Sequence, residues 1–299
     1  MKGYQMLNGS ERQSGAMPPD GREWRAGARA YELKELVEGD PDSVVMMPPP
    51  DPIGEDPFLD DERDLVGRVL PAVAAGLGVA LIGGNGVGKT ALVFHVARIL
   101  GRPLWTLQCH MDIEPGDITI RPRLASDGGC RRLASPVVAA LRGNGILLMD
   151  ELGKVNDRTL APLAPLDWRR YFDSDLVGRK FAASPDFAVI ATVNPADLDH
   201  ARREGRWLYE FIMSRLPVHI KCDRPAAEHL QKIVAARFGD SPLVDAFKCW
   251  TGAGSVTPRQ AIAMIQYASA RHNGGGPVSK AEALRLIADA ATVIAGGAA

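Results

Sequence analysis

The sequence has few cysteines and no excess of charge of either sign, and both absences exclude classes of protein. The four cysteines among 299 residues include no CxxC pair, which argues against a disulfide scaffold or a cysteine zinc site. Dispersed thiols of this kind are typical of a reducing compartment. Lys and Arg total 35 against 36 for Asp and Glu, so the net charge of −1 gives no bulk attraction for polynucleotides. The cysteines are Cys109, Cys130, Cys222 and Cys249.

Long apolar runs and metal-binding or hydrolase patterns are also missing. No stretch reaches about 18 uninterrupted apolar residues, the length that a membrane-spanning helix needs. The N-terminal segment lacks the run of about 7 to 15 apolar residues of a secretory signal. The six histidines form no pair at i,i+4 spacing, and no HExxH or Ser-His-Asp arrangement is present. We therefore expect a soluble cytoplasmic protein without a membrane-bound part.

What is present is an ordinary globular composition, with 46% hydrophobic and 24% charged residues. Residues 1–55 are predicted to form an N-terminal extension with one helix over 22–38 and a proline-rich linker around 48–50. Residues 56–224 alternate between apolar strand patterns and helix patterns, which predicts an α/β domain with a parallel sheet. Residues 225–299 show helix patterns alone and predict a small all-helical lid domain.

The boundaries of these elements follow from hydrophobic periodicity and from glycine and proline positions. Most of the expected strands are short apolar runs, as in central strands that are buried on both faces. The expected strands are 78–82, 104–109, 145–149, 187–193 and 217–222. The expected helices are 60–77, 90–100, 136–142, 226–238, 242–250, 258–272 and 280–294.

Residues 83–90 match the phosphate-binding pattern GxxxxGK[ST] between a predicted strand and a predicted helix. Glycines let successive backbone N–H groups converge on phosphate oxygens at the positive end of the helix. Lys89 would then contact the β- and γ-phosphates, and the Thr90 hydroxyl would ligate Mg²⁺. The nucleotide-binding candidates are Gly83, Gly84, Asn85, Gly86, Val87, Gly88, Lys89, Thr90 and Ala91.

The second half of the candidate site is an acidic pair, Asp150-Glu151, directly after the apolar run 146–149. Ligands of open α/β sheets bind at the carboxyl ends of the strands, where this pair is expected. Asp150 would hold Mg²⁺, and Glu151 would polarise the water that attacks the γ-phosphate. The sequence therefore predicts a P-loop NTPase.

Three further positions indicate which class of P-loop NTPase the chain resembles. Asn194 follows an apolar strand, Arg215 ends a predicted helix before the last strand, and Arg259 opens a helix of the C-terminal region. In this order the motifs resemble the sensor 1, arginine-finger and sensor 2 positions of AAA+ ATPases. Over roughly residues 56–290 the chain is similar to the MoxR group, and within it to the dynein-related subgroup. Segments 145–152 (GILLMDEL) and 186–195 (DFAVIATVNP) carry much of that resemblance.

The resemblance implies an AAA+ core that hydrolyses ATP with Mg²⁺ in a ring, expected to be a homo-hexamer. Asn194 would orient the attacking water, Arg215 would reach the nucleotide of a neighbouring subunit, and Arg259 would sense it. Three other arginines are alternatives for the finger but look more like solvated or interface residues: Arg202, Arg203 and Arg206. Relatives in this group activate Rubisco or nitric-oxide reductase or help to insert metals, often with a partner that carries a von Willebrand factor A domain.

Two segments are candidates for loops that contact a substrate protein, because the resemblance to MoxR-like proteins implies a hairpin that precedes sensor 1 and faces the opening of the ring. Residues 171–181 read as a hairpin with a turn near 177–178, and 117–134 as a loop with a turn at 127–129. A plain surface hairpin is the alternative for 171–181, and contact of either loop with a substrate stays open. The remodelled target, the choice between ATP and GTP, and the ring stoichiometry stay open. So do two other functions, a nucleic-acid-dependent motor or restriction-type NTPase subunit and a nucleotide-binding switch that barely turns over.

Overall fold

The computed structural model describes residues 31–34, 44–54, 58–124, 128–164, 166, 170–174, 179–272 and 277–296. Contacts divide the chain into two compact units. The sheet unit comprises Met1–Gly54, Gly67–Ile82 and Val93–Ile220, and the helical unit comprises Glu55–Val66, Gly83–Leu92 and Lys221–Ala299. Each unit is described by itself below. The domain boundaries expected at 55/56 and 224/225 stay a prediction.

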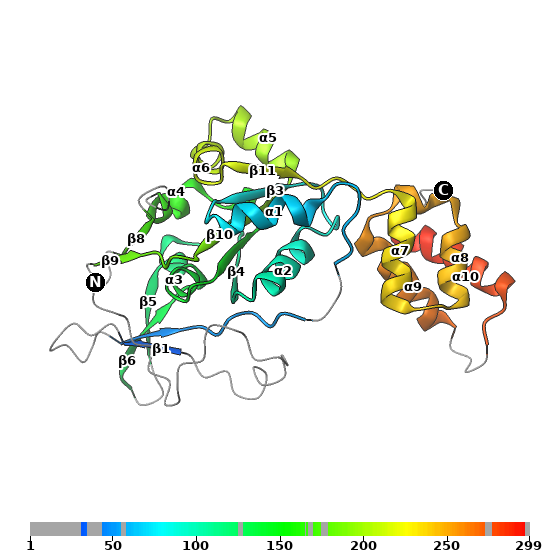
Figure 1. Ribbon diagram of the computed structural model, residues 1–299, viewed down its shortest axis with the longest axis horizontal. Helices are drawn as coiled ribbons and strands as arrows, with labels where there is room; N and C mark the ends of the chain where they lie inside the picture. Colours follow the sequence, from blue (N-terminus) through cyan, green and yellow to red (C-terminus); the bar gives the residue numbers. More distant parts are fainter. Residues whose placement is uncertain are drawn as a thin grey trace. The chain divides into compact units, whose positions relative to one another are not determined.

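The sheet unit is built on a five-stranded sheet in the order β11-β3-β10-β7-β4 (Figure 1). The pairs β3–β10, β10–β7 and β7–β4 are parallel, as the alternating pattern predicts. Most residues of these strands are apolar and buried because helices and loops cover both faces. The strands are β3 (Val79–Ile82), β4 (Leu104–Gln108), β7 (Ile146–Asp150), β10 (Ala188–Val193) and β11 (Val218–Lys221), each within two residues of its predicted bounds.

Helices flank this sheet, and side-chain caps explain where two of them begin. Helix α3 (Pro136–Arg142) begins after Ser135, whose hydroxyl accepts the N–H of Val138. Helix α1 (Leu65–Ala74) is shorter than predicted because the Asp60 carboxylate accepts the N–H groups at its first turn and ends the preceding loop. The other helices are α2 (Lys89–Leu100), α4 (Asp157–Leu160), α5 (Pro195–Arg203) and α6 (Trp207–Arg215), with the single turns η3 (Pro115–Ile118), η4 (Leu152–Lys154) and η5 (Ala161–Leu163).

A second sheet corrects two predictions about the N-terminal extension. Its order is β1-β2-β6-β5, with β1 at Tyr31–Lys34 and β2 at Val44–Met47. The helix expected over 22–38 is wrong at residues 31–34, and its other residues lie outside those described. The proline-rich linker likewise contains strand β2. Strand β1 pairs antiparallel with β2, and such non-local hydrogen bonds override a moderate helical pattern.

The two expected surface loops are both antiparallel hairpins. Strands β8 (Tyr171–Ser174) and β9 (Arg179–Ala182) confirm the predicted hairpin, whose turn at 175–178 lies outside the described residues. In the other loop, β5 (Ile120–Leu124) pairs with β6 (Cys130–Ala134) around the expected turn. These two strands were missed because their arginines and proline break the apolar alternation.

In the C-terminal part of the helical unit, the described residues from 221 to 296 form four helices and the turn η6 (Thr251–Ser255), as the sequence predicts (Figure 1). Ser241, Thr257 and Ser279 cap three of the helices by accepting a backbone N–H. The core of this unit includes fully buried Phe247 and Met264. The helices are α7 (Ala227–Phe238), α8 (Pro242–Cys249), α9 (Pro258–Arg271) and α10 (Lys280–Ile294). Among the described residues, no helix has the length and apolar character needed to cross a membrane.

Candidate functional site

The parallel strands of the sheet unit end at one edge, and the predicted site residues follow those ends. Val193 of β10 lies beside Ile82 of β3, and Ala191 lies beside Met149 of β7. Asp150 therefore comes level with Thr192, one position beyond that pair. Three segments leave this edge in turn: the phosphate-binding loop after β3, Glu151 after β7, and Asn194 after β10. The sequence prediction that the acidic pair lies at the carboxyl edge is confirmed.

The phosphate-binding loop is shaped by glycines that have no room for a side chain. A Cβ on Gly83 would lie 2.1 Å from the Cys222 carbonyl oxygen, inside any normal contact distance. Gly86 has φ +76°, a left-handed backbone that L-residues rarely adopt. The Lys89 ammonium donates to the carbonyl oxygens of Gly83 and Gly84, both at 2.7 Å, and so curls over the loop. Of the two glycines that the pattern GxxxxGK[ST] requires, Gly83 has a steric reason, and Gly88, with φ +103°, has a conformational one.

The helical unit brings this loop against the predicted sensor 2 segment. The Arg259 N–H lies 3.4 Å from the Gly86 carbonyl oxygen, and a Cβ on Gly86 would lie 2.9 Å from Thr257 Oγ1. Thr257 and Gln260 form a capping box that fixes the start of α9. The Arg259 side chain is exposed in the first turn of that helix. Of the other loop candidates, Gly84, Asn85 and Ala91 are exposed, and Val87, Gly88 and Thr90 are half-buried.

The acidic pair is held by a hydroxyl from the neighbouring strand. Thr192 Oγ1 donates to Asp150 Oδ1 at 2.6 Å and accepts the Glu151 N–H at 2.9 Å. Glu151 has the left-handed backbone angles φ 59° and ψ 40°, which are uncommon for a residue other than glycine. Its carboxylate accepts a hydrogen bond from Lys154 Nζ at 2.5 Å, and this bond raises the pKa of Lys154. Neither Thr192 nor Lys154 is among the predicted site residues.

A signal for each of them exists in the sequence. Thr192 is the one hydroxyl residue in the apolar strand Ala188–Val193, which leads directly to Asn194. A buried hydroxyl needs a hydrogen-bond partner, so its presence there indicates a polar neighbour. Lys154 stands three residues after Glu151, a spacing at which side chains meet on one face of a helical turn.

Asn194 begins helix α5 and uses its side-chain oxygen to do so. The Asn194 Oδ1 atom accepts the Ala196 N–H at 3.0 Å, the usual geometry of an N-cap. The side-chain amide nitrogen of Asn194 is a donor group, which is what a contact to a phosphate or a water requires. The sensor role predicted for Asn194 is compatible with its capping role and stays a prediction.

Arg215 ends α6 at the opposite edge of the sheet from the acidic pair. A Cβ on Gly78, the residue before β3, would lie 2.3 Å from the Arg215 carbonyl oxygen. In the sheet, Asp150 of β7 lies level with Leu81 of β3, and Gly78 comes three residues before Leu81. Three strand residues span roughly 10 Å at about 3.3 Å per residue. The Arg215 guanidinium donates to the Ala164 carbonyl oxygen at 3.2 and 3.3 Å. Arg215 therefore does not lie next to the acidic pair of its own chain.

The alternative arginines have other surroundings. Arg202 and Arg203 are exposed in the last turn of α5. Arg206 donates to the Val155 carbonyl oxygen at 2.5 Å and to Asp157 Oδ1 at 3.3 Å. Asp157 in turn accepts two N–H groups at the start of α6, so Arg206 is tied into the beginning of that helix.

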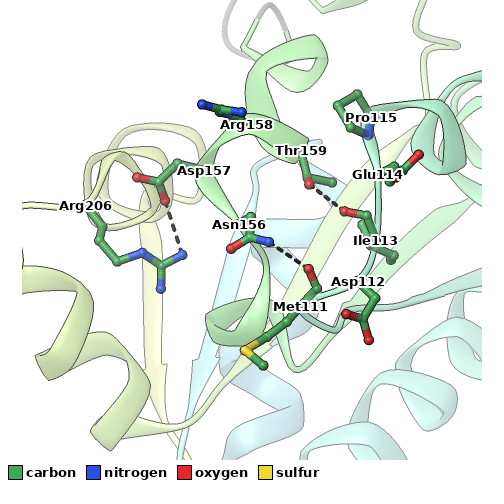
Figure 2. Close-up of a pocket in the computed structure, with 10 residues that line it drawn as sticks. All are labelled: Met111, Asp112, Ile113, Glu114, Pro115, Asn156, Asp157, Arg158, Thr159 and Arg206. Atoms are coloured by element: carbon green, nitrogen blue, oxygen red, sulfur yellow. Dashed lines mark hydrogen bonds and ion pairs between the residues drawn. The ribbon is translucent and has the colours of Figure 1, made fainter.

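Arg206 also lines an open pocket of about 770 Å³ in the sheet unit (Figure 2). One wall is the segment 111–115 after β4, and the other is the segment 156–159 at α4. Figure 2 shows Thr159 donating to the Ile113 carbonyl oxygen and Asn156 donating to that of Met111, both at 2.7 Å. These bonds join the two walls of the pocket.

Cys109 lies beside the acidic pair, directly after strand β4. Its N–H donates to the Asp150 carbonyl oxygen at 2.8 Å, which continues the pairing of β4 with β7. Burial, together with the negative charges of Asp150 and Glu151, raises the pKa of the Cys109 thiol well above its usual range. Of the other described cysteines, Cys222 is buried and Cys249 is exposed.

The donor chemistry fits a magnesium ion bound together with a nucleotide. No group of three or more His, Cys, Asp or Glu side chains among the described residues could hold a metal by itself. Mg²⁺ in nucleotide sites commonly takes one or two protein oxygens and completes its shell with phosphates and waters. A hydroxyl from Thr90 and a carboxylate from Asp150 are the hard oxygen ligands that such an ion prefers.

Comparison with known proteins agrees with this arrangement. Residues 78–216 match the family model "AAA domain (dynein-related subfamily)". The chain is 36% identical to Protein NorQ of Paracoccus denitrificans over 140 residues, covering 46% of this chain and 52% of that protein. It is 31% identical to Protein CbbQ of Hydrogenophilus thermoluteolus over 144 residues, covering 48% and 54%. The chain thus spans about half the length of the curated relatives it matches.

Solved structures with little sequence identity share the fold. NtrX from Brucella abortus in complex with ADP has a TM-score of 0.55 at 14% identity, covering 80% of this chain and 56% of that one. A RuvB mutant from Thermotoga maritima has a TM-score of 0.53 at 14% identity, covering 76% and 69%. With the family match and the curated relatives, these findings confirm the predicted fold. Residues 78–216 thus match the dynein-related AAA family that the motifs predicted, and the chain is similar to NorQ and CbbQ.

Proposed function

We propose that this protein hydrolyses ATP with Mg²⁺ as a ring of subunits, and that the cycle remodels or activates a partner protein complex. One observation carries the hydrolytic part of the proposal. Three parallel strands end at one edge, from which the phosphate-binding loop, the acidic pair and Asn194 follow in turn. This is the position in which open α/β sheets bind ligands.

Each of these residues has a chemical role in the proposal. The N–H groups of the loop and the Lys89 ammonium bind the phosphates and stabilise charge on the γ-phosphoryl group during transfer. Thr90 and Asp150 hold Mg²⁺, which when bound neutralises charge on the β- and γ-phosphates. Glu151 accepts a proton from the attacking water, and Asn194 orients that water. Arg259 contacts the nucleotide from the helical unit.

Arg215 acts in this proposal on the nucleotide of a neighbouring subunit. Its backbone lies roughly 10 Å along the strand direction from the level of Asp150, at the other edge of the sheet. A guanidinium supplied in trans stabilises the charge that develops in phosphoryl transfer. The Arg215 side chain would leave the Ala164 carbonyl oxygen in order to reach the neighbouring nucleotide. The requirement for a neighbour is what favours a closed ring, and we propose a homo-hexamer.

The protein on which the ring acts is proposed from the resemblance to the MoxR group. The β8–β9 and β5–β6 hairpins are the candidate substrate-facing loops. A protein with a von Willebrand factor A domain is the proposed adaptor, and a metalloenzyme is a proposed target. The cytoplasmic location favoured by the dispersed cysteines belongs to the same proposal.

The experiment that tests ring hydrolysis is ATP turnover per subunit across a wide range of protein concentration, with a mass measurement beside it. Turnover per subunit should rise steeply and reach a plateau as rings assemble. Arg215→Ala should abolish the plateau, and Arg203→Ala, a change of an exposed arginine on α5, should leave it unchanged. A monomer that turns over ATP at a constant rate would overturn the ring and the finger together.

Mixing two inactive variants tests action in trans directly. Arg215→Ala subunits keep Glu151, and Glu151→Gln subunits keep Arg215, so an active site forms wherever the two meet in the required order. Random mixing at equal amounts should restore about one quarter of the wild-type turnover per subunit. Mixing Lys89→Ala with Glu151→Gln is the matched control. This mixture should restore no turnover. Lys89 and Glu151 each act on the nucleotide bound by their own subunit, so every site in the mixture lacks one of the two groups.

A further inference from the structure

Thr192 is one of only four buried polar residues among those that the structure describes, and its side chain is 1% exposed. It lies in β10, level with Asp150 of the adjacent strand β7. Its hydroxyl makes two hydrogen bonds, both to the acidic pair rather than to its own strand. A buried hydroxyl needs hydrogen-bond partners, and both partners here are the acidic residues at the end of the adjacent strand.

The two bonds fix the direction of the hydroxyl proton. The Glu151 N–H donates to Thr192 Oγ1 at 2.9 Å, so this oxygen is the acceptor there. The hydroxyl hydrogen is then directed to Asp150 Oδ1 at 2.6 Å. One carboxylate oxygen of Asp150 is thereby held against the strand, and the side-chain rotamer is set. A short hydrogen bond to a carboxylate is among the stronger ones in proteins.

The same hydroxyl supports the backbone of Glu151. The left-handed angles φ 59° and ψ 40° persist in a non-glycine residue only when the surroundings hold them. At this point β7 ends, and the Glu151 N–H turns to a side chain on β10 for its acceptor. The backbone turn determines where the Glu151 carboxylate begins, so Thr192 acts on both acidic residues at once.

We propose that Thr192 is the positioning residue of the acidic pair, which orients Asp150 toward the metal and sets the backbone turn from which Glu151 reaches the attacking water. This inference rests on the proposed function, because it assigns Thr192 to the same reaction. Thr192 touches neither substrate nor metal in the proposal and acts only through the two carboxylates.

The test compares Thr192→Val, which keeps the shape and removes the hydroxyl, with Thr192→Ser, which keeps the hydroxyl. Thr106→Val is the matched control in the same sheet. The Thr106 hydroxyl is buried in β4 without a hydrogen-bond partner among the described residues, so its loss should change neither hydrolysis nor magnesium dependence. Thr192→Val should lower turnover at saturating Mg²⁺ by roughly tenfold or more, the usual effect of removing the partner of a metal ligand.

A readout other than turnover separates positioning from general damage. Binding of a fluorescent ATP analogue should require roughly tenfold more Mg²⁺ in Thr192→Val, whereas binding in EDTA should be unchanged. Thr192→Ser should restore both turnover and magnesium dependence to within a few-fold of wild type. The proposal is overturned if the serine variant is as impaired as the valine variant, or if Thr192→Val keeps the wild-type magnesium dependence.

Measuring wild type and Glu151→Gln in the same assay separates a failure of the proposed function from a failure of the positioning role of Thr192. If wild type hydrolyses ATP and Glu151→Gln does not, the proposed function stands, and the Thr192 variants decide the positioning role by themselves. If wild type does not hydrolyse ATP at any concentration, the proposed function fails. The positioning role toward Asp150 is then decided by the magnesium dependence of analogue binding.

Discussion

The phosphate-binding loop and the acidic pair are two halves of one predicted site, but they are made of different materials. The loop is mainly backbone, and glycines at Gly83 and Gly86 remove side chains that would collide or strain it. The acidic pair is made of side chains, and a hydroxyl from another strand holds it. A site made of backbone requires fixed residue types at fixed spacing, whereas a site made of side chains requires strand register. The two halves should therefore fail in different ways when altered.

The largest expected effects separate binding from chemistry. Lys89→Ala removes the charged donor of the loop and should weaken ATP binding by roughly ten- to a hundredfold, with loss of hydrolysis. Glu151→Gln keeps the size of the side chain and removes the base, so hydrolysis should fall by about a hundredfold or more with binding retained. Equilibrium binding of a fluorescent ATP analogue and steady-state turnover measure the two effects.

Lys232→Ala, a change of an exposed lysine on α7, is the control for removal of a positive charge. It should resemble wild type in both assays. If Glu151→Gln lost ATP binding to the same extent as Lys89→Ala, the division between a binding half and a chemical half would be wrong.

A smaller effect is expected from two neighbouring glycines of the loop. Gly83→Ala places a Cβ 2.1 Å from the Cys222 carbonyl oxygen, whereas a Cβ on Gly84 meets no atom within 4 Å. Gly83→Ala should lower the free energy of unfolding by about 1–3 kcal/mol, the usual cost of forcing atoms into a packed site. Gly84→Ala should change it by less than about 0.5 kcal/mol. Urea denaturation of both variants measures the difference, and equal losses would show that steric fit does not determine the loop.

The same contrast explains which parts were predictable. The loop pattern, the carboxyl-edge position of the acidic pair and the helices α7 to α10 depend on residues close together in the chain. Caps such as Ser241 and Ser279 mark their helix starts in the sequence itself. The fold and the residues in both halves of the site could therefore be predicted from patterns of residues that are close together in the chain.

The missed features depend on pairing between distant segments. Strand β1 pairs with β2, and β2 pairs with β6, which lies more than 80 residues later in the chain. Strands β1 and β2 have only four residues each, so the sequence favoured a helix over 22–38 and a linker around the prolines instead. Thr192 was overlooked for the same reason, since its importance comes from the register of β10 with β7. Sequence periodicity places a residue on a strand but does not name its neighbour.

The smallest expected effect concerns the ion pair of Glu151 with Lys154. Both side chains are well exposed, at 41% and 47%, so the pair should contribute at most about 0.5 kcal/mol to stability. Lys154→Met should leave urea denaturation almost unchanged. Turnover should rise about twofold, because the Glu151 carboxylate no longer has to leave a partner before it accepts a proton from water. Steady-state turnover at saturating ATP measures this effect.

Lys248→Met is the matched control, since Lys248 forms an exposed i,i+3 pair with Asp245 in α8 at 3.1 Å. It should change neither stability nor turnover. The expectation rests on the view that Lys154 only occupies the Glu151 carboxylate. A fall in turnover of tenfold or more in Lys154→Met, with the control unchanged, would instead make Lys154 a part of the chemical half. The acidic pair would then depend on side chains from its own turn as well as from β10, and its difference from the backbone-built loop would be larger still.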